Sequence, residues 1–107
     1  MGDIFDEIIT IFKKNDLIPL KRLNHFYKYI GKSTTKINGE EFQSITYGIS
    51  STNQKRVTRK LIEETYKYYK THEEFPDINW YRREFPFEIK SRPCNKSVAK
   101  GLIKSII

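Results

Sequence analysis

The sequence predicts a small α+β domain that is mostly helical, and three observations support this class. Apolar residues recur at the three- and four-residue spacing of helices over most of the chain. One central stretch alternates instead, and it contains Asn38-Gly39, a dipeptide typical of tight hairpin turns. The 107 residues suit one domain with a real core, and fifteen aromatic residues argue against disorder. We therefore expect one compact domain over residues 1–107, with helices at about 3–14, 19–30, 52–70, 77–85 and 96–106 and one β-hairpin near 35–49.

Two helices are predicted before the hairpin. Residues 3–14 form an apolar stripe, with Asp3 as a possible cap, acidic residues in the first turn and lysines in the last. Core packing is the simplest use of that stripe, and a partner-binding amphipathic helix is the alternative. Pro19 suits the first turn of a second helix over 19–30, which Gly31 would end as a C-cap.

The predicted hairpin centres on Asn38-Gly39 and covers residues 35–49. An isolated hairpin is barely stable in water, so this one must pack against helices. Two helices followed by a hairpin would also fit a winged-helix-like unit. We expect His25, in the helix at 19–30 and just off its apolar stripe, to be a half-buried structural residue.

The central helix is predicted over 52–70, with Ser51 and Gln54 at the spacing of a capping box. Thr52 or Asn53 could equally serve as the cap. Four cations, Lys55, Arg56, Arg59 and Lys60, would occupy its first turns, against the helix dipole. Glu63 and Glu64 could pair with two of them at four-residue spacing. A solvated face and a phosphate-contacting helix start are both consistent with this cluster.

Two more helices follow a polar break at His72, which we interpret as a surface residue. Asp77 is the expected cap of the helix at 77–85, and Pro86 is expected to close it. Residues 87–94 are predicted to be extended or irregular. The last helix, 96–106, carries lysines at four-residue spacing on one side, an arrangement that is mildly repulsive unless an anion meets it.

The sequence contains none of the motifs that mark common enzymes. It has no glycine-rich phosphate loop, no paired carboxylates in a helical frame and no spacing typical of metal ligands. Its single cysteine, Cys94, excludes an intramolecular disulfide, and one cysteine with two histidines makes a zinc site improbable. We therefore expect a non-enzymatic protein with no catalytic residues, no metal and no cofactor.

Targeting signals are also missing from the sequence as given. No apolar run approaches the roughly 20 residues that cross a bilayer. The acidic beginning, MGDIFDE, does not resemble a signal or transit peptide. A cytoplasmic, reducing location without membrane contact is the expectation.

The charge distribution points to an anionic partner. The net charge is +7, and residues 51–107 hold thirteen Lys or Arg against seven Asp or Glu. A basic surface of this kind favours nucleic acid, with double-stranded DNA as the preferred target and RNA as a possible one. The start of the last helix, residues 95–100, is similar in composition to recognition helices of helix-turn-helix proteins. The candidate nucleic-acid-binding residues are Lys55, Arg56, Arg59, Lys60, Arg82, Arg83, Lys90, Arg92, Lys96, Lys100 and Lys104.

A second hypothesis is a protein-interaction module, such as a small regulator or inhibitor that binds an acidic protein. Tyr66, Tyr69, Trp80 and Tyr81 would then supply interface anchors, because aromatic residues are enriched there. Their alternative role is in the core. The oligomeric state is left open by the sequence.

Overall fold

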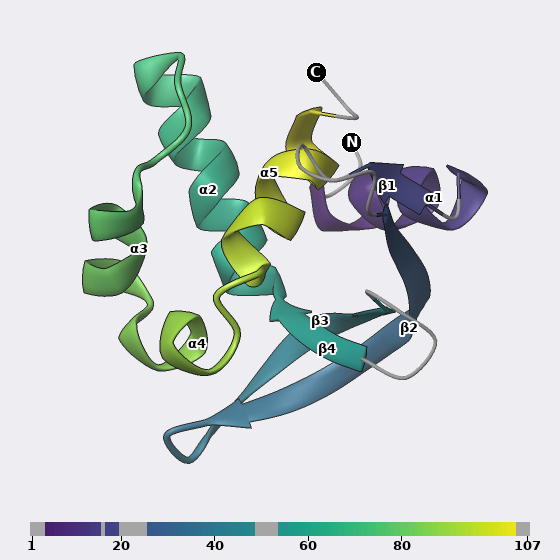
Figure 1. Ribbon diagram of the computed structural model, residues 1–107, viewed down its shortest axis with the longest axis horizontal. Coiled ribbons are helices and arrows are strands. Elements are labelled where there is room, and N and C mark those ends of the chain that lie inside the picture. The colour runs from purple at the N-terminus through teal and green to yellow at the C-terminus, as the bar shows by residue number, and fades with distance from the viewer. Residues whose placement is uncertain (1–3, 16, 20–25, 49–53, 105–107) are drawn as a thin grey trace.

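The computed structural model describes residues 4–15, 17–19, 26–48 and 54–104, and the α+β class is confirmed (Figure 1). Within these residues, five helices accompany an antiparallel sheet. The elements in chain order are α1 (Ile4–Asn15), β1 (Leu17–Pro19), β2 (Phe26–Ile37), β3 (Glu40–Gly48), β4 (Gln54–Thr58), α2 (Arg59–His72), α3 (Ile78–Glu84), α4 (Pro86–Ser91) and α5 (Asn95–Lys104).

The predicted hairpin is present, but it belongs to a larger sheet. β2 and β3 pair around Asn38 and Gly39, whose φ angles of 52° and 83° are those of a primed turn. The three-residue β1 and the five-residue β4 extend this pair, and the strand order is β1-β2-β3-β4 with antiparallel neighbours. Two flanking strands thus give the hairpin the support that it would lack alone.

The predicted helix at 19–30 is wrong where the structure describes it. Pro19 ends β1 and pairs with Phe26, and residues 26–30 are the first part of β2. Residues 20–25 lie outside the described part of the chain. A short run of aromatic and β-branched residues fits a sheet as well as a helix, and strand pairing decides between them. Gly31 is not a C-cap, since it lies in β2 beside a register shift that follows Tyr29.

The central helix starts later than predicted. Gln54–Thr58 is β4, in which Val57 pairs with Ile45, and α2 begins only at Arg59. Thr58 is its cap, because its Oγ1 accepts a hydrogen bond of 3.2 Å from the Leu61 backbone N–H. The caps expected at 51–53 lie outside the described residues. The helix runs to His72, and Glu73 ends it with a left-handed φ of 58°.

The C-terminal predictions are mostly confirmed. α3 begins after Asp77, whose carboxylate accepts a hydrogen bond of 2.9 Å from the Trp80 N–H, as expected for the cap. α5 corresponds to the last predicted helix as far as Lys104. The extended segment predicted at 87–94 is wrong, because α4 occupies Pro86–Ser91. Pro86 does not simply end one helix; it also occupies the first turn of the next, where its missing N–H costs nothing.

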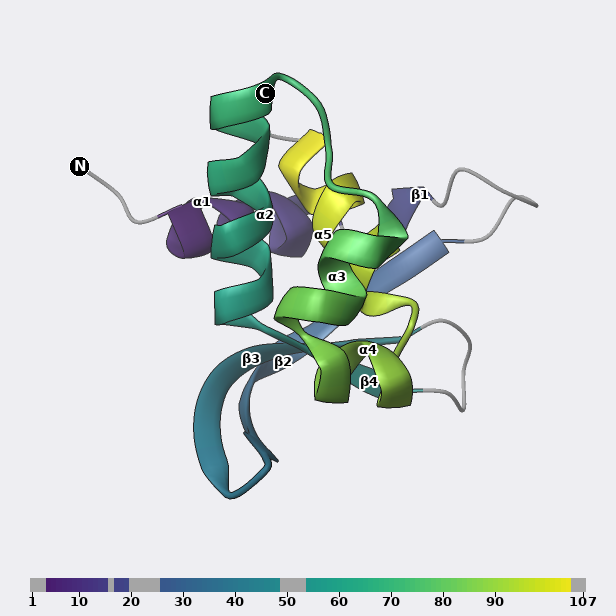
Figure 2. The same ribbon diagram turned by 90° about the vertical axis from the view of Figure 1, so that its left-hand side faces the viewer.

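The core lies between the sheet and the helices. In both views α1, α2 and α5 lie on one side of the sheet, while α3 and α4 flank them (Figures 1 and 2). The largest fully buried side chains among the described residues come from β3, β4, α1, α2, α3 and α5: Ile8, Phe12, Ile45, Tyr47, Val57, Leu61, Ile62, Tyr81, Val98, Leu102 and Ile103. None of the described helices is both long and apolar enough to cross a membrane.

Candidate nucleic-acid interface

Three of the predicted cations converge on one groove. Arg82 of α3, Lys90 of α4 and Lys96 of α5 line a depression of about 470 Å³. The rest of its lining is apolar: Ile78, Pro86, Ile89 and Pro93. No acidic residue lines it among the described residues, so its formal charge is positive. We call this feature the basic groove.

The groove exists because the chain turns sharply between α4 and α5. The Arg92 N–H bonds to the Glu88 carbonyl at 2.8 Å, and the Asn95 N–H bonds to the Arg92 carbonyl at 3.0 Å. Lys96 Nζ donates to the Pro93 carbonyl at 3.0 Å, which holds its ammonium at the groove wall. Arg82 and Lys90 are exposed, and neither forms an ion pair or a hydrogen bond through its side chain with another described residue.

The connection of α4 to α5 has the length of a helix-turn-helix turn, since residues 92–94 join the two helices. However, α5 is a core helix, with Val98, Ala99, Leu102 and Ile103 buried. It therefore presents only a narrow polar edge to the surface. Contact with phosphates along that edge suits this packing better than insertion of the whole helix into a DNA groove.

The two remaining lysines of that edge pack on aromatic rings. Lys100 Nζ lies 5.6 Å from the centre of the Tyr81 ring, and Lys104 Nζ lies 5.6 Å from that of Phe75. Tyr81 is fully buried, and burial raises its pKa to about 12, although its hydrogen bond with Thr65 lowers it. The ring thus remains neutral at physiological pH, and Lys100 and Lys104 continue the edge from the basic groove toward the end of α5.

Two cations expected at the helix start are instead on β4, beside the beginning of α5. Lys55 Nζ lies 4.0 Å from Cys94 Sγ, in the connection whose Pro93 lines the groove. Arg56 is exposed, and its guanidinium donates a hydrogen bond of 3.1 Å to the Thr34 carbonyl. The Arg56 carbonyl accepts a hydrogen bond of 2.9 Å from the Asn95 side-chain amide. The sheet therefore brings Lys55 close to the basic groove, as the sequence alone could not establish.

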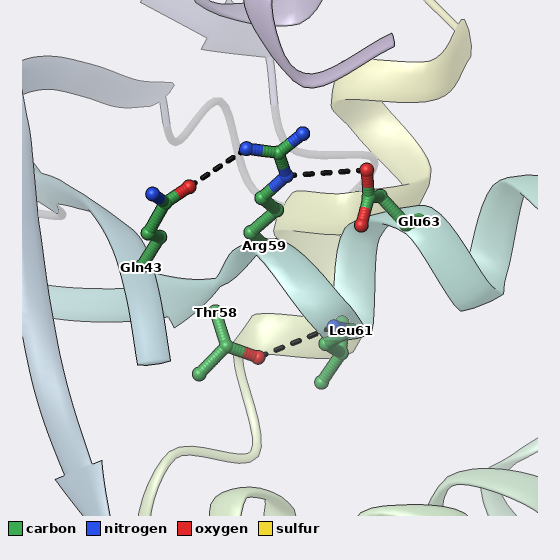
Figure 3. A network of polar contacts seen from close by, with 5 residues as sticks. All are labelled: Gln43, Thr58, Arg59, Leu61 and Glu63. Atoms are coloured by element: carbon green, nitrogen blue, oxygen red, sulfur yellow. Dashed lines mark hydrogen bonds and ion pairs between the residues drawn. The ribbon is translucent and has the colours of Figure 1, made fainter. Parts of the chain in front are cut away.

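Arg59 and Lys60 lie elsewhere. Arg59 donates to Glu63 at 3.2 Å and to Gln43 at 2.7 Å (Figure 3). Its guanidinium also lies over the Phe5 ring, 5.0 Å from the ring centre. Lys60 lies 6.0 Å from the centre of the Phe42 ring. The expected pair of Arg59 with Glu63 is present, whereas Glu64 pairs with Lys67 at 3.8 Å rather than with Lys60. Neither cation lines the basic groove.

The last two candidates flank the groove without lining it. Arg83 is exposed and pairs with Glu84 at 3.4 Å, so part of its charge is neutralised. Arg92 is half-buried in the connection between α4 and α5. The predicted set thus separates into three groove residues, several neighbours and two cations at the start of α2.

A buried polar network holds this region together, and the sequence analysis missed it. The Glu88 carboxylate is 3% exposed and accepts hydrogen bonds from the Thr58 N–H at 3.1 Å, the Thr58 hydroxyl at 2.6 Å and the Asn95 amide at 2.6 Å. Asn95 in turn accepts from the Tyr47 hydroxyl at 2.5 Å. The network ties α4 and the start of α5 to the junction of β4 and α2. The only sequence signal that could have indicated this buried network is the position of an acidic residue, Glu88, between the apolar residues Phe87 and Ile89.

Of the four aromatic residues expected as interface anchors, Tyr81 is buried, whereas Tyr66, Tyr69 and Trp80 are half-buried. Tyr81 is fully buried, and Trp80 lies 5.7 Å from Phe85 between ring centres. Tyr69 packs against Phe75 at 4.8 Å. Tyr81 is therefore a core residue rather than an anchor.

The described residues contain no group of histidine, cysteine or acidic side chains that could hold a metal ion. The chain matches no protein-family model, and no curated protein or solved structure is significantly similar to it. Any functional proposal therefore depends on its own surface.

Proposed function

We propose that the protein is a small, non-enzymatic nucleic-acid-binding domain whose main contact is the basic groove. The observation that carries this proposal is the convergence of Arg82, Lys90 and Lys96, from three helices, on a groove without an acidic lining residue. Such an arrangement concentrates positive potential and attracts a polyanion. Double-stranded DNA is the preferred target, and RNA is a possible one.

Each cation would have a distinct role in binding. Arg82 can hold one phosphate with two parallel hydrogen bonds, whereas Lys90 and Lys96 act as point charges. The apolar groove floor would pack against sugars, and contacts of this kind fix the position of the strand without reading its sequence. Lys55, Lys100 and Lys104 would extend the contact on either side.

The salt dependence of binding tests the proposal. If about five phosphates are neutralised, log K should fall against log salt with a slope of about −4 to −5. Replacing Arg82, Lys90 and Lys96 by Gln should reduce that slope by about 2 to 3, since each released phosphate contact contributes about 0.9. Fluorescence anisotropy with labelled duplex DNA and RNA would measure both, and would also rank the two targets.

A matched control removes equal charge from elsewhere. Lys36, Lys67 and Lys70 are exposed and line none of the groove, so their replacement by Gln keeps the net charge of the two triple variants equal. If both triple variants lose affinity equally, or if affinity ignores salt, the groove is not the binding site.

A protein-interaction module is the second candidate, and exposed Phe87 favours it. This side chain is 56% exposed on α4 and borders a pocket of about 260 Å³. That pocket is also lined by Glu40 and Glu84, so an acidic partner would place an apolar side chain against Phe87 and its carboxylates in the basic groove. A pull-down from nuclease-treated extract separates the candidates: a retained acidic protein that Phe87→Ser releases supports the interaction module.

A further inference from the structure

The pocket beside Phe87 borders the basic groove, since Pro86 is the one described residue that lines both. One wall comes from the hairpin formed by β2 and β3, and the other comes from the end of α3 and the start of α4. In Figure 1, α4 lies above the turn of the hairpin. We call this feature, whose apolar walls include Ile37, Phe42, Phe85 and Phe87, the hairpin pocket.

The phenylalanine rings of the hairpin pocket give the first indication of a partner. Phe87 is 56% exposed, and Ile30 at 44% is the only other large apolar side chain so exposed among the described residues. Phe42 and Phe85 are half-buried and line the same pocket. Three rings that meet at one cavity form an apolar patch, and patches of this kind mark contact sites more often than single exposed residues do.

The hairpin pocket is already formed in the free protein, because hydrogen bonds hold the residues between its walls. Glu88 accepts from the Thr58 hydroxyl at 2.6 Å and from the Thr58 N–H at 3.1 Å, and both residues line the pocket. On the other wall, Ile37 pairs with Glu40 beside the hairpin turn. A side chain that enters therefore finds ordered walls, which lowers the entropy lost on binding.

The carboxylates of the hairpin pocket indicate the charge of the partner. The lining contains Glu40, Glu84 and Glu88 against one cation, Lys60, so its formal charge is negative although the net charge of the chain is +7. Glu40 is exposed and forms no ion pair with another described residue. Glu84 pairs with Arg83 through Oε2 at 3.4 Å, which leaves Oε1 able to accept. These carboxylates attract a cationic segment and repel an acidic one.

The position of Lys60 shows how a cation can be held in this pocket. Its Nζ lies 6.0 Å from the centre of the Phe42 ring, a contact of the cation–π type. No described cation lies over the Phe87 ring. A Lys or Arg side chain of a partner can therefore pack on Phe87 and reach Glu84 from there.

We propose that the hairpin pocket docks a basic segment of a partner protein. One large apolar side chain of that segment enters between Phe42 and Phe87, and a neighbouring Lys or Arg contacts Glu40 or Glu84. Exposed charge pairs contribute little, so the apolar contact supplies most of the affinity and the carboxylates supply selectivity. The partner differs from the acidic one considered above, whose carboxylates would occupy the basic groove.

Binding of three capped pentapeptides tests the proposal: Lys-Phe-Lys-Phe-Lys, Glu-Phe-Glu-Phe-Glu and Lys-Ser-Lys-Ser-Lys. Fluorescence of Trp80 reports binding, because its ring centre lies 5.7 Å from that of Phe85 and none of the peptides contains tryptophan. We expect the basic phenylalanine peptide to bind about fivefold more tightly than the acidic one. The serine peptide should bind about tenfold more weakly than the basic phenylalanine peptide, because it lacks an apolar side chain to bury. If either of these two matched the basic phenylalanine peptide, or if none of the three bound, the proposal would be wrong.

Two variants, each with a matched control, locate the contacts. Phe87→Ser should weaken binding of the basic phenylalanine peptide about tenfold. Ile30→Ser replaces the other exposed large apolar side chain, which lies outside the pocket, and should leave binding unchanged. Glu40→Gln should weaken binding about threefold. Glu41→Gln removes the same charge at the next residue, which is exposed but lines no part of the pocket. Equal losses within either pair would overturn the assignment.

The triple variant of the basic groove separates this inference from the proposed function. Replacing Arg82, Lys90 and Lys96 by Gln should not weaken peptide binding, because none of the three lines the hairpin pocket. Phe87→Ser should likewise leave DNA binding unchanged. If the triple variant lost the peptide as well as DNA, the peptide would not be bound by the hairpin pocket.

Discussion

Glu88 is a buried carboxylate that is stabilised by neutral donors. Glu88 is the acceptor in all three of its hydrogen bonds, as suits an ionised carboxylate, and no described cation pairs with it. Thr58 contributes twice, through its N–H and its hydroxyl, while the same hydroxyl caps α2. A charge without these bonds would be costly at 3% exposure. One residue therefore links the packing of α4 with the beginning of α2.

Replacing Glu88 by Gln should destabilise the protein by about 1–3 kcal/mol. The new amide NH₂ would stand either at Oε2, where it meets both the Thr58 N–H and the Asn95 amide, or at Oε1, where it meets the Thr58 hydroxyl, so at least one of the three present hydrogen bonds would be lost or reversed. Urea unfolding measures the change in the free energy of unfolding.

Glu84→Gln provides the control for this prediction. Glu84 is exposed just before α4, and its replacement should change stability by less than about 0.5 kcal/mol. If the two variants were equally stable, the hydrogen bonds of Glu88 would contribute nothing measurable.

At the scale of elements, the sequence predicted the parts that local signals determine. Asp77 marks the start of α3, and Asn38-Gly39 marks the hairpin turn, because a cap and a primed turn are formed by neighbouring residues. The residues of β4 and the first part of β2 were assigned to helices. Val57 is in a strand because it pairs with Ile45, a contact between residues far apart that no local pattern encodes.

The positive φ angle of Gly39 in the hairpin turn can be tested by substitution. Gly39→Ala should destabilise the domain by about 1–2 kcal/mol, because an L side chain is strained at the φ of 83° found there. Gly31→Ala is the matched control: it also lies in open space, but without a positive φ. Thermal unfolding of both variants checks the difference, and an equal loss would mean that the turn conformation is not the cause.

At the scale of the whole molecule, the sequence predicted the residues of the candidate sites better than their grouping. Arg82, Lys90 and Lys96 were each predicted, but their convergence depends on α4, which was expected to be extended. Lys32 was not among the predicted residues, because only the sheet brings it into one pocket with Arg59. Composition therefore indicated a basic surface, whereas its division into separate sites required the tertiary fold.

The central position of α5 predicts that the domain unfolds as one unit. Leu102→Ala, at 1% exposure, should destabilise it by about 2–5 kcal/mol through a cavity in the core. Far-UV circular dichroism reports all helices and strands, whereas fluorescence of the single tryptophan, Trp80, reports α3. We expect both signals to change at the same urea concentration, in the original and in the variant. A separate, earlier transition of Trp80 would show that α3 and α4 form their own unit.

The six residues of α4 join the interior to the exterior. Glu88 anchors this helix from within, and Lys90, two residues later, offers its charge to solvent. A ligand that bridges Lys90 and Lys96 would hold α4 in place, and so would oppose breaking of the hydrogen bonds that Glu88 accepts from Thr58 and Asn95. Ligand binding at Lys90 and Lys96 should consequently increase the free energy of unfolding, because α4 carries both the binding residue Lys90 and the buried Glu88.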